Sequence, residues 1–405
     1  MDGDAPIILI TGFEPSGDDH AASVVSVLKA RYPDVRIVGW CGPRTRDAGA
    51  EPVALTGANA VMGLPGLAKI REHQRINRDI EAWLDAHRGK VIAHVPVDSP
   101  AANFPICAMA KKRGVPVVHL VAPQIWAWGS WRIGKLRRLT SFVCCVLPFE
   151  EQFFRERGVP AKFVGHPLFD EPMDDAAMDA QIEAWPEAWR TGSPKIAIMP
   201  GSRPAEIERN FPLLLSAYRK LEAEYGSIRG VIAATSGGVA TRLREIAESP
   251  GVGGRGWPAS LRIETQKTDA VARWSDVALV VSGTVTLQVS RHLKPMVIVY
   301  KSSRLLYELL GRWLVRTPFF SLPNLIVGRE VVPELIPHFG GDQPILDRAI
   351  ELIERPEVAR RQVDGLGEVV GAFSGSRAAE GAADAIARVA GLKAEAPVEE
   401  AVLQS

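Results

Sequence analysis

The chain has 405 residues, 46% of them hydrophobic, so it is long enough for two globular domains that each bury a core. Its formal net charge of +1 argues against bulk nucleic-acid binding and against a broadly cationic membrane surface. The four cysteines lack Cys-x-x-Cys spacing and are expected to be buried residues of a reducing compartment. The eight histidines lack ligand spacing, so no metal site is expected.

The N-terminus has none of the features of a secretory signal peptide. No run in the sequence reaches the roughly 18 apolar residues of a membrane-spanning helix. These observations predict a cytoplasmic protein, which could still lie against a membrane.

The first half of the chain alternates short Val/Ile/Leu runs with helical stretches. The predicted strands are 7–11, 36–40, 91–97, 115–121 and 142–147, and a helix is predicted over 18–32. Continuous apolar runs indicate strands that are buried on both faces, and therefore a parallel sheet flanked by helices.

The pattern stops over residues 168–194, which are acidic and contain three prolines, and then starts again. The second set of predicted strands is 195–199, 230–234, 261–264, 277–281 and 296–300. The predicted fold class is α/β, with two Rossmann-like, doubly wound parallel-sheet domains. We expect the first domain at 1–170, the second at 171–343, C-terminal helices at 344–391 that could pack back on the first domain, and a disordered tail at 392–405.

In open α/β sheets, ligands bind beyond the carboxyl ends of the strands. The first strand is followed by a turn and the start of a helix, with the sequence ITGFEPSGDDHAA, which contains Ser16, Gly17, Asp18 and His20. A helix cap alone would explain Ser16. The number of polar side chains exceeds what a cap needs and suggests a polar pocket.

Asp98 stands at the end of the predicted strand 91–97, directly before a Ser-Pro pair. An aspartate that closes a turn and an aspartate that acts as a general base are equally compatible with this spacing.

Two later strands run into turns of Gly and Ser that each open a helix. PGSR at 200–203 exposes backbone N–H groups at a helix N-terminus, where phosphates bind, and its arginine can hold phosphate oxygens through two hydrogen bonds. The turn lacks the lysine and spacing of a Walker A motif, so ATP hydrolysis is not expected. VSGTVTLQ at 281–288 repeats the arrangement, and a pair of such turns suits a nucleotide diphosphate. The residues expected at this site are Gly201, Ser202, Arg203, Ser282, Gly283 and Thr284.

PQIWAWGSWRIGKLRR at 123–138 places three tryptophans within six residues, ahead of four basic side chains. Tryptophan next to Arg and Lys suits a lipid headgroup or a membrane interface. Nucleic acid is a weaker alternative because the chain is nearly neutral. The residues expected to face lipid here are Trp126, Trp128, Trp131, Arg132 and Lys135.

Together these segments resemble the lipid-A-disaccharide synthases, a glycosyltransferase family with two Rossmann-like domains of the GT-B type. The resemblance holds in order and spacing from about residue 7 to residue 336. It rests on SGDDHAA (16–22), CGPR (41–44), VMG (61–63), VDSP (97–100), the tryptophan-rich segment, LPFEEQFF (147–154), VGHPLFD (164–170), PGSRPAEIE (200–208), SGT (282–284) and SLPNLIVGRE (321–330).

The resemblance implies that a UDP-2,3-diacylglucosamine donor passes its sugar to the 6-hydroxyl of 2,3-diacylglucosamine 1-phosphate. The products are a β-1,6 disaccharide and UDP, and the family inverts the anomeric carbon without a metal or other cofactor. Asp98 corresponds to the family's proposed catalytic carboxylate, and Arg203 to an arginine that stabilises the diphosphate. The SGT turn corresponds to the nucleotide loop, and Asn324 and Arg329 to a motif that flanks it.

Family members are peripheral membrane proteins, which implies a place on the cytoplasmic face of the inner membrane. The stretch GLPGLAKI, with Leu64 and Leu67, corresponds to a region of the membrane-facing surface. The family resemblance also leaves a homodimer open, which the sequence itself does not show.

Two departures from the family pattern bear on substrate. Ala101 stands where the family carries a second aspartate, and Gln288 stands where it carries a glutamate for the ribose hydroxyls, so we expect weaker UDP binding. Two alternatives therefore stay open. One is a diverged enzyme of the same fold, either a transferase or an epimerase for another UDP-sugar, and the other is a non-catalytic protein that binds UDP-sugar or lipid.

Overall fold

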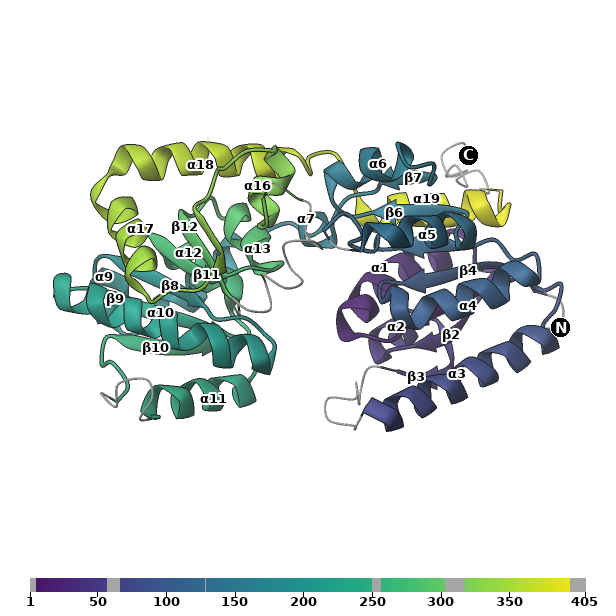
Figure 1. Cartoon of the computed structure of the whole chain (residues 1–405), viewed down its shortest axis with the longest axis horizontal. Coiled ribbons are helices and arrows are strands. Elements are labelled where there is room, and N and C mark those ends of the chain that lie inside the picture. The colour runs from purple at the N-terminus through teal and green to yellow at the C-terminus, as the bar shows by residue number, and fades with distance from the viewer. Residues whose placement is uncertain are drawn as a thin grey trace, which may run out of the picture. The chain divides into compact units, whose positions relative to one another are not determined.

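The computed structural model describes residues 5–56, 66–127, 129–249, 256–302, 317 and 319–393. The chain divides into two compact units, one made of Met1–Glu171 with Gly375–Ser405 and the other of Pro172–Ser374. Each unit contains one parallel sheet with helices packed around it (Figure 1).

The first unit contains a seven-stranded parallel sheet in the order β3-β2-β1-β4-β5-β6-β7. Its strands are β1 (Ile7–Gly12), β2 (Arg36–Cys41), β3 (Glu51–Leu55), β4 (Val91–Val97), β5 (Val118–Leu120), β6 (Phe142–Cys145) and β7 (Ala161–Phe163). The chain runs outward from β1 to β3, returns to the other side of β1 as β4, and then runs outward again. The strand order therefore reverses between β1 and β4, and ligands bind at such a reversal in open α/β sheets.

The helices of the first unit include one from the far C-terminal part of the chain. They are α1 (Pro15–Arg31), α2 (Pro43–Asp47), α3 (Gly66–Ala86), α4 (Pro100–Lys112), the 3₁₀ helix η1 (Ser130–Arg132), α5 (Ile133–Leu139), α6 (Pro148–Arg155), α7 (Pro167–Asp170) and α19 (Ala378–Ala390). The Asp170 carboxylate accepts the backbone N–H groups of Ala378 at 2.8 Å and Ala379 at 3.1 Å, which caps α19. The apolar face of α19 is buried in the same core as β1 and β4.

The second unit contains a six-stranded parallel sheet in the order β10-β9-β8-β11-β12-β13. Its strands are β8 (Lys195–Met199), β9 (Arg229–Ala234), β10 (Leu261–Thr265), β11 (Val277–Val281), β12 (Met296–Lys301) and β13 (Glu334–His338). Here the strand order reverses between the neighbouring strands β8 and β11. The two Gly/Ser turns identified in the sequence follow these two strands.

The described helices of the second unit surround this sheet. They are α8 (Asp175–Glu183), α9 (Glu187–Thr191), α10 (Pro204–Glu224), α11 (Gly237–Glu248), α12 (Thr268–Trp274), α13 (Val285–Arg291), α16 (Leu322–Val327), α17 (Gln343–Glu354) and α18 (Pro356–Gly371). The helical segment 344–391 is thus shared, because α17 and α18 belong to this unit and α19 to the other. The expected tail, 392–405, lies outside the described residues from 394 onward.

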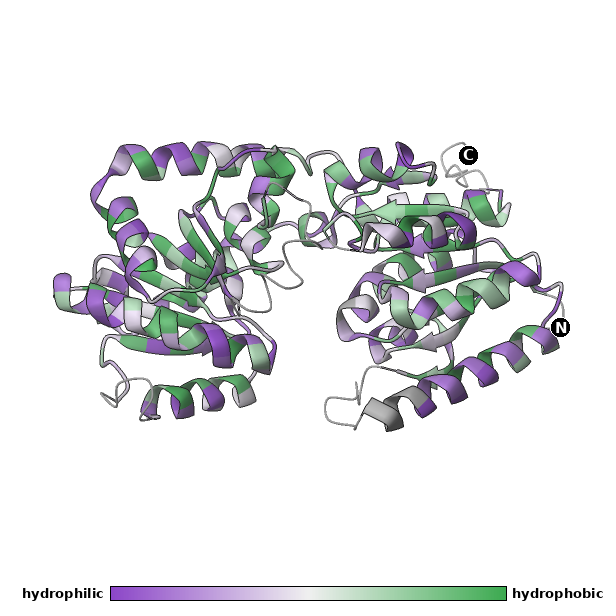
Figure 2. Cartoon of the chain, in the orientation of Figure 1, coloured by the Kyte–Doolittle hydropathy of each residue, from purple (hydrophilic) through white to green (hydrophobic). Residues whose placement is uncertain are grey.

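The predicted α/β class with two doubly wound sheets is confirmed. Three strands escaped prediction, namely β3, β7 and β13, and each lies at an edge of its sheet. The central strands are largely apolar, whereas the helices alternate apolar and polar positions (Figure 2). This is the pattern expected for helices that cover a buried parallel sheet.

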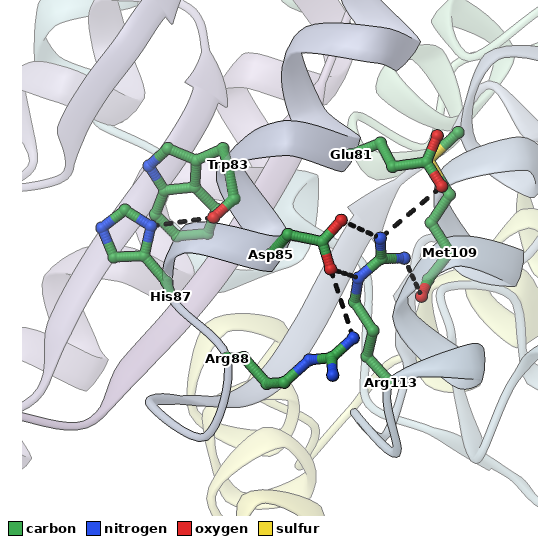
Figure 3. A network of polar contacts seen from close by, with 7 residues as sticks. All are labelled: Glu81, Trp83, Asp85, His87, Arg88, Met109 and Arg113. Atoms are coloured by element: carbon green, nitrogen blue, oxygen red, sulfur yellow. Dashed lines mark hydrogen bonds and ion pairs between the residues drawn. The ribbon is translucent and has the colours of Figure 1, made fainter.

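An ionic cluster joins α3 to the C-terminal end of α4. The Arg113 guanidinium donates to both carboxylate oxygens of Asp85, at 2.9 and 2.6 Å, and lies 3.5 Å from Glu81 (Figure 3). Arg113 also donates to the carbonyl of Met109 at 3.1 Å, which covers the end of its own helix. These contacts anchor the helix whose opposite end begins two residues after Asp98.

No helix in the described ranges is long and apolar enough to cross a membrane.

Candidate active site

Asp98 and Ser99 lie at the strand reversal of the first sheet, between the end of β4 and the start of α4. Both have left-handed backbone angles, with φ of 45° and 38°. This conformation costs about 1–3 kcal/mol in a non-glycine residue and persists only where the surroundings hold it. The N–H of Asp98 donates to the carbonyl of Leu120 at 3.0 Å, and the Ser99 hydroxyl donates to the Glu14 carboxylate at 2.6 Å. The turns after β1 and β4 and the end of β5 are therefore joined around the half-buried Asp98.

Asp18 joins the first motif to the CGPR motif. Its buried carboxylate accepts the backbone N–H groups of Arg44 at 2.9 Å and Thr45 at 3.0 Å, and it also accepts the Thr45 hydroxyl. A Cβ atom on Gly42 would lie 2.3 Å from the Asp18 carboxyl group, so this approach requires glycine. In this structure Asp18 serves as the cap of α2. The carboxylate is already occupied by protein donors.

The other residues predicted in this motif lie in the first turns of α1. Ser16 is part of the helix, and Gly17 faces Val97, where an added Cβ would lie 3.3 Å from Val97 Cγ1. The half-buried His20 ring packs edge-to-face on His166, with 6.0 Å between the ring centroids. Burial lowers the pKa of His20 and lowers that of His166 to about 3, so both rings are neutral.

His20 also lines a small, mostly apolar pocket near the carboxyl ends of β5, β6 and β7. The other lining residues are Ser23, Val24, Leu120, Val146, Val164, Pro167, Ala378 and Ala379. The N-terminus of α19 thus forms part of the wall.

Glu150 is a buried acid that sequence reasoning missed. Its carboxylate accepts the Trp126 indole N–H at 2.8 Å and the backbone N–H groups of Val146 and Leu147 at 3.1 Å each. Burial raises the pKa of Glu150 to about 7, and the negative charge of Asp98 acts in the same direction. The tryptophan-rich and LPFE motifs therefore form one contact within electrostatic range of Asp98. The order of the two motifs was visible in the sequence, but their pairing was not.

The residues expected to face lipid differ in their surroundings. Trp126 is half-buried by Glu150 and by the edge of the Phe149 ring, whereas Trp131 is 67% exposed. Burial lowers the pKa of the half-buried Arg132, and the Lys135 ammonium lies 5.1 Å from the Phe104 ring centroid. Leu67 lies in α3, while Leu64 and Trp128 lie outside the described residues.

In the second unit, the turn 200–203 joins β8 to α10. Gly201 has φ of 98°, a left-handed value that favours glycine. Ser202 is exposed, and Arg203 is the N-cap residue of α10 with a side chain that is 76% exposed. The Arg203 guanidinium lies 2.9 Å from the carboxylate of Glu206, one turn into the helix.

The neighbouring turn, 282–284, joins β11 to α13. The N–H of Ser282 donates to the carbonyl of Val299 at 3.1 Å, while Gly283 and Thr284 are exposed. Gln288 follows on α13 and is half-buried. A Cβ atom on Gly201 would lie 3.7 Å from Val281, the last residue of β11, so the two turns lie side by side. Together they present two backbone turns and one arginine at the same sheet edge, which is suited to a bound diphosphate.

Asn324 and Arg329 make contacts within the second unit. The Asn324 amide donates to the carbonyl of Val332 and to Glu334, at 2.8 and 3.0 Å, and accepts the N–H groups of Val331 and Val332. This fully buried side chain therefore organises the chain ahead of β13, and its helix α16 packs against α13. The exposed Arg329 pairs with Glu368 on α18.

Comparison with solved structures defines the class of fold. The chain is similar to the Staphylococcus aureus MnaA–UDP co-structure, with a TM-score of 0.62, 15% identity, and coverage of 97% of this chain and 98% of that chain. It is similar to Arabidopsis thaliana UGT89C1, with a TM-score of 0.60, 12% identity, and coverage of 95% and 100%. It is also similar to a UDP-GlcNAc 2-epimerase from Neisseria meningitidis bound to UDP-GlcNAc. The TM-score is 0.58 at 13% identity, and the match covers 90% of this chain and 97% of that chain. The shared architecture is the two-domain GT-B fold.

Comparison of sequences identifies the family. The family described as lipid-A-disaccharide synthetase matches residues 7–381. Lipid-A-disaccharide synthase of Solibacter usitatus is 34% identical over 380 residues, which cover 93% of this chain and 96% of the relative. The Myxococcus xanthus enzyme is 34% identical over 387 residues, and that of Anaeromyxobacter sp. strain K is 38% identical over 330. The Myxococcus match covers 94% of this chain and 97% of the relative, and the Anaeromyxobacter match covers 81% of this chain and 83% of the relative.

The chain belongs to the lipid-A-disaccharide synthetase family, as the sequence motifs predicted, and is a glycosyltransferase. The alternatives of a diverged relative or a non-catalytic binding protein are not favoured.

Proposed function

We propose that this protein transfers 2,3-diacylglucosamine from UDP-2,3-diacylglucosamine to the 6-hydroxyl of 2,3-diacylglucosamine 1-phosphate. The observation that carries the proposal is the family match over residues 7–381, in a chain that keeps Asp98 and Arg203 on turns next to a strand reversal. The products are the β-1,6 disaccharide 1-phosphate and UDP.

In this reaction the Asp98 carboxylate is the general base. It accepts the proton of the acceptor 6-hydroxyl while that oxygen forms a bond to C1 of the donor sugar. The bond between C1 and the diphosphate oxygen breaks on the opposite face, and its electron pair leaves with UDP. One displacement of this kind inverts the anomeric carbon. The left-handed turn and its bonds to Leu120 and Glu14 support this role, because a base must be held close to one proton.

The two turns of the second unit hold the UDP. Backbone N–H groups of 201–203 and 282–284 bind the diphosphate, and the Arg203 guanidinium stabilises the charge that develops on it. An exposed ion pair such as that of Arg203 with Glu206 contributes little, so the guanidinium can turn to the ligand at small cost. Gln288 accepts a hydrogen bond from a ribose hydroxyl, while Asn324 and Arg329 support the nucleotide side from behind α13.

The exposed Trp131, with Lys135 one turn along the chain, supports contact with an anionic membrane surface on the cytoplasmic side. Trp126 supports this segment from within the first unit through Glu150. Liposome flotation tests the surface. Trp131→Ser should reduce the fraction of protein bound to vesicles that contain phosphatidylglycerol. An unchanged bound fraction would mean that Trp131 is not part of the membrane-contacting surface.

The proposed reaction is tested by measuring UDP release from UDP-2,3-diacylglucosamine with and without 2,3-diacylglucosamine 1-phosphate. We expect release that depends on the acceptor, together with a disaccharide product seen by mass spectrometry. The Asp98→Asn variant should bind UDP normally and turn over about 10³-fold more slowly, since it removes a general base. Measurable UDP binding without acceptor-dependent release would overturn the proposal.

A further inference from the structure

The turn that carries Asp98 is held from below by a buried polar side chain on α4. The Asn103 side chain is fully buried, and its amide nitrogen donates to the carbonyl oxygens of Val97 at 3.1 Å and Asp98 at 2.9 Å. These two carbonyls flank the point where the backbone leaves the strand and becomes left-handed. Asn103 thus bonds to the peptide groups on both sides of the Asp98 α-carbon.

The hydrogen bonds behind Asn103 have only one possible direction. Its amide nitrogen faces two carbonyl oxygens, so its Oδ1 must be the atom that accepts the Thr11 hydroxyl proton, at 2.8 Å. The Thr11 oxygen has then given its only proton. It must therefore accept from His94 Nε2, which lies 2.9 Å away. Thr11 and His94 are fully buried.

This direction also places a proton on Nε2 of His94. The buried Nδ1 has no hydrogen-bond partner among the described residues, so nothing there stabilises a second proton. Burial lowers the pKa of His94 to about 3, which agrees with a neutral ring at physiological pH. The chain of donors runs from His94 on β4, through Thr11 on β1, to Asn103 on α4 and back to the end of β4. It crosses the strand reversal of the first sheet.

We propose that Asn103, oriented by Thr11, is a positioning residue that sets the direction of the Asp98 carboxylate towards the acceptor hydroxyl. The inference rests on the proposed function, in which Asp98 is the base. Rotation of the two peptide groups that Asn103 holds would swing the Asp98 side chain away from one fixed proton. A displacement of about 1 Å can cost a reaction about 10²-fold.

The test compares Thr11→Val with Thr11→Ser in the full-length enzyme. Valine has the shape of threonine without the hydroxyl, so Asn103 Oδ1 and His94 Nε2 both lose a partner, whereas serine keeps it. We expect Thr11→Val to lower kcat by about 10²-fold, with UDP affinity unchanged, because the displaced group is the base and not the nucleotide site. Thr11→Ser should restore most of the rate. Titration with UDP measures the concentration of folded enzyme in each preparation.

A double-mutant cycle separates positioning from a general effect on the fold. In the Asp98→Asn background the base is already absent, so Thr11→Val should change the residual rate by less than about 2-fold. The same loss in both backgrounds, or an unchanged kcat in Thr11→Val, would overturn the inference. Should Thr11→Val not fold, Asn103→Ser is expected to give the same coupling to Asp98. A wild-type enzyme without acceptor-dependent UDP release would contradict the proposed function instead.

Discussion

The two units each carry candidate functional residues on turns next to a strand reversal, and they hold them in opposite ways. Asp98 of the first unit lies on a left-handed turn whose backbone bonds to Leu120 and to the buried Asn103. Arg203 of the second unit has a 76% exposed side chain at the start of a helix, in a surface ion pair with Glu206. A base has to meet one proton at a short distance, so it needs a rigid support. A cation that neutralises a diphosphate acts over a longer range, and it can be drawn into place by the ligand.

The largest effect that would sharpen this comparison is expected from Arg203→Ala. Loss of one charged donor to the leaving diphosphate should lower kcat by about 10²–10³-fold, because the contact strengthens as the charge develops. Arg203→Lys should recover part of the rate, since a lysine keeps the charge without the two-pronged geometry. Steady-state kinetics of UDP release measures both.

The matched control for Arg203 is Arg348→Ala. Arg348 is also an exposed arginine that pairs with a glutamate three residues along its helix, but it lies on α17. It should leave kcat unchanged within a factor of about two, as expected for surface pairs. An Arg203→Ala enzyme with the same kcat as this control would exclude the arginine from transition-state stabilisation.

The histidines with lowered pKa values, which are His20, His94, His119 and His166, all lie in the first unit. Burial lowers the pKa of His119 to about 4, and it lowers those of His94 and His166 to about 3. Such a ring is neutral in the folded state and takes up a proton on unfolding once the pH falls below about 6.5. Its contribution to stability is therefore complete above that pH and is lost as the pH falls towards the folded value.

The contribution of Glu150 to stability depends on pH in the opposite direction. Burial raises its pKa to about 7, so its contribution to stability is present below the ordinary carboxyl value and is lost as the pH rises through 7. Each pKa unit corresponds to about 1.4 kcal/mol, and three deeply buried histidines outweigh one carboxyl. We expect the first unit to lose stability on acidification from pH 7.5 to 5. Hydrogen exchange, corrected for its intrinsic pH dependence, should rise in first-unit peptides more than in those from 172–374. An equal rise in both units would contradict this asymmetry.

The central strands of both sheets could be predicted because they are buried on both faces and read as unbroken apolar runs. Three of the four edge strands, β3, β7 and β13, could not, because an edge strand is covered on fewer sides. All five residues of β3 are exposed, β13 is mostly half-buried, and β7 has three residues. What identifies these strands is pairing with a neighbour, and pairing is a property of the folded sheet.

The site was predictable to the same extent. Asp98 and Arg203 stand where apolar runs end, and strand ends are visible in a sequence. The contacts around Asp98 are not visible, since Thr11 and Asn103 meet across 92 positions and Trp126 meets Glu150 across 24. The predicted contact of Asp18 with substrate stays a prediction, but its carboxylate is bonded to the start of α2, 26 residues away.

The smallest expected effect concerns the nucleotide side of the comparison, where Gln288 is one of the two departures from the family pattern. Gln288→Glu introduces a carboxylate at the half-buried position where the family carries one for the ribose hydroxyls. A hydrogen bond to a charged acceptor exceeds a neutral one by about 1 kcal/mol, so UDP should bind about 5-fold more tightly. Calorimetric titration with UDP measures the change. If the side chains of the second unit are drawn into place by the ligand, as the exposed Arg203 suggests, kcat should change little while the UDP affinity rises. A weaker affinity in Gln288→Glu would mean that this position does not meet the ribose, and that glutamine there is part of a different nucleotide site.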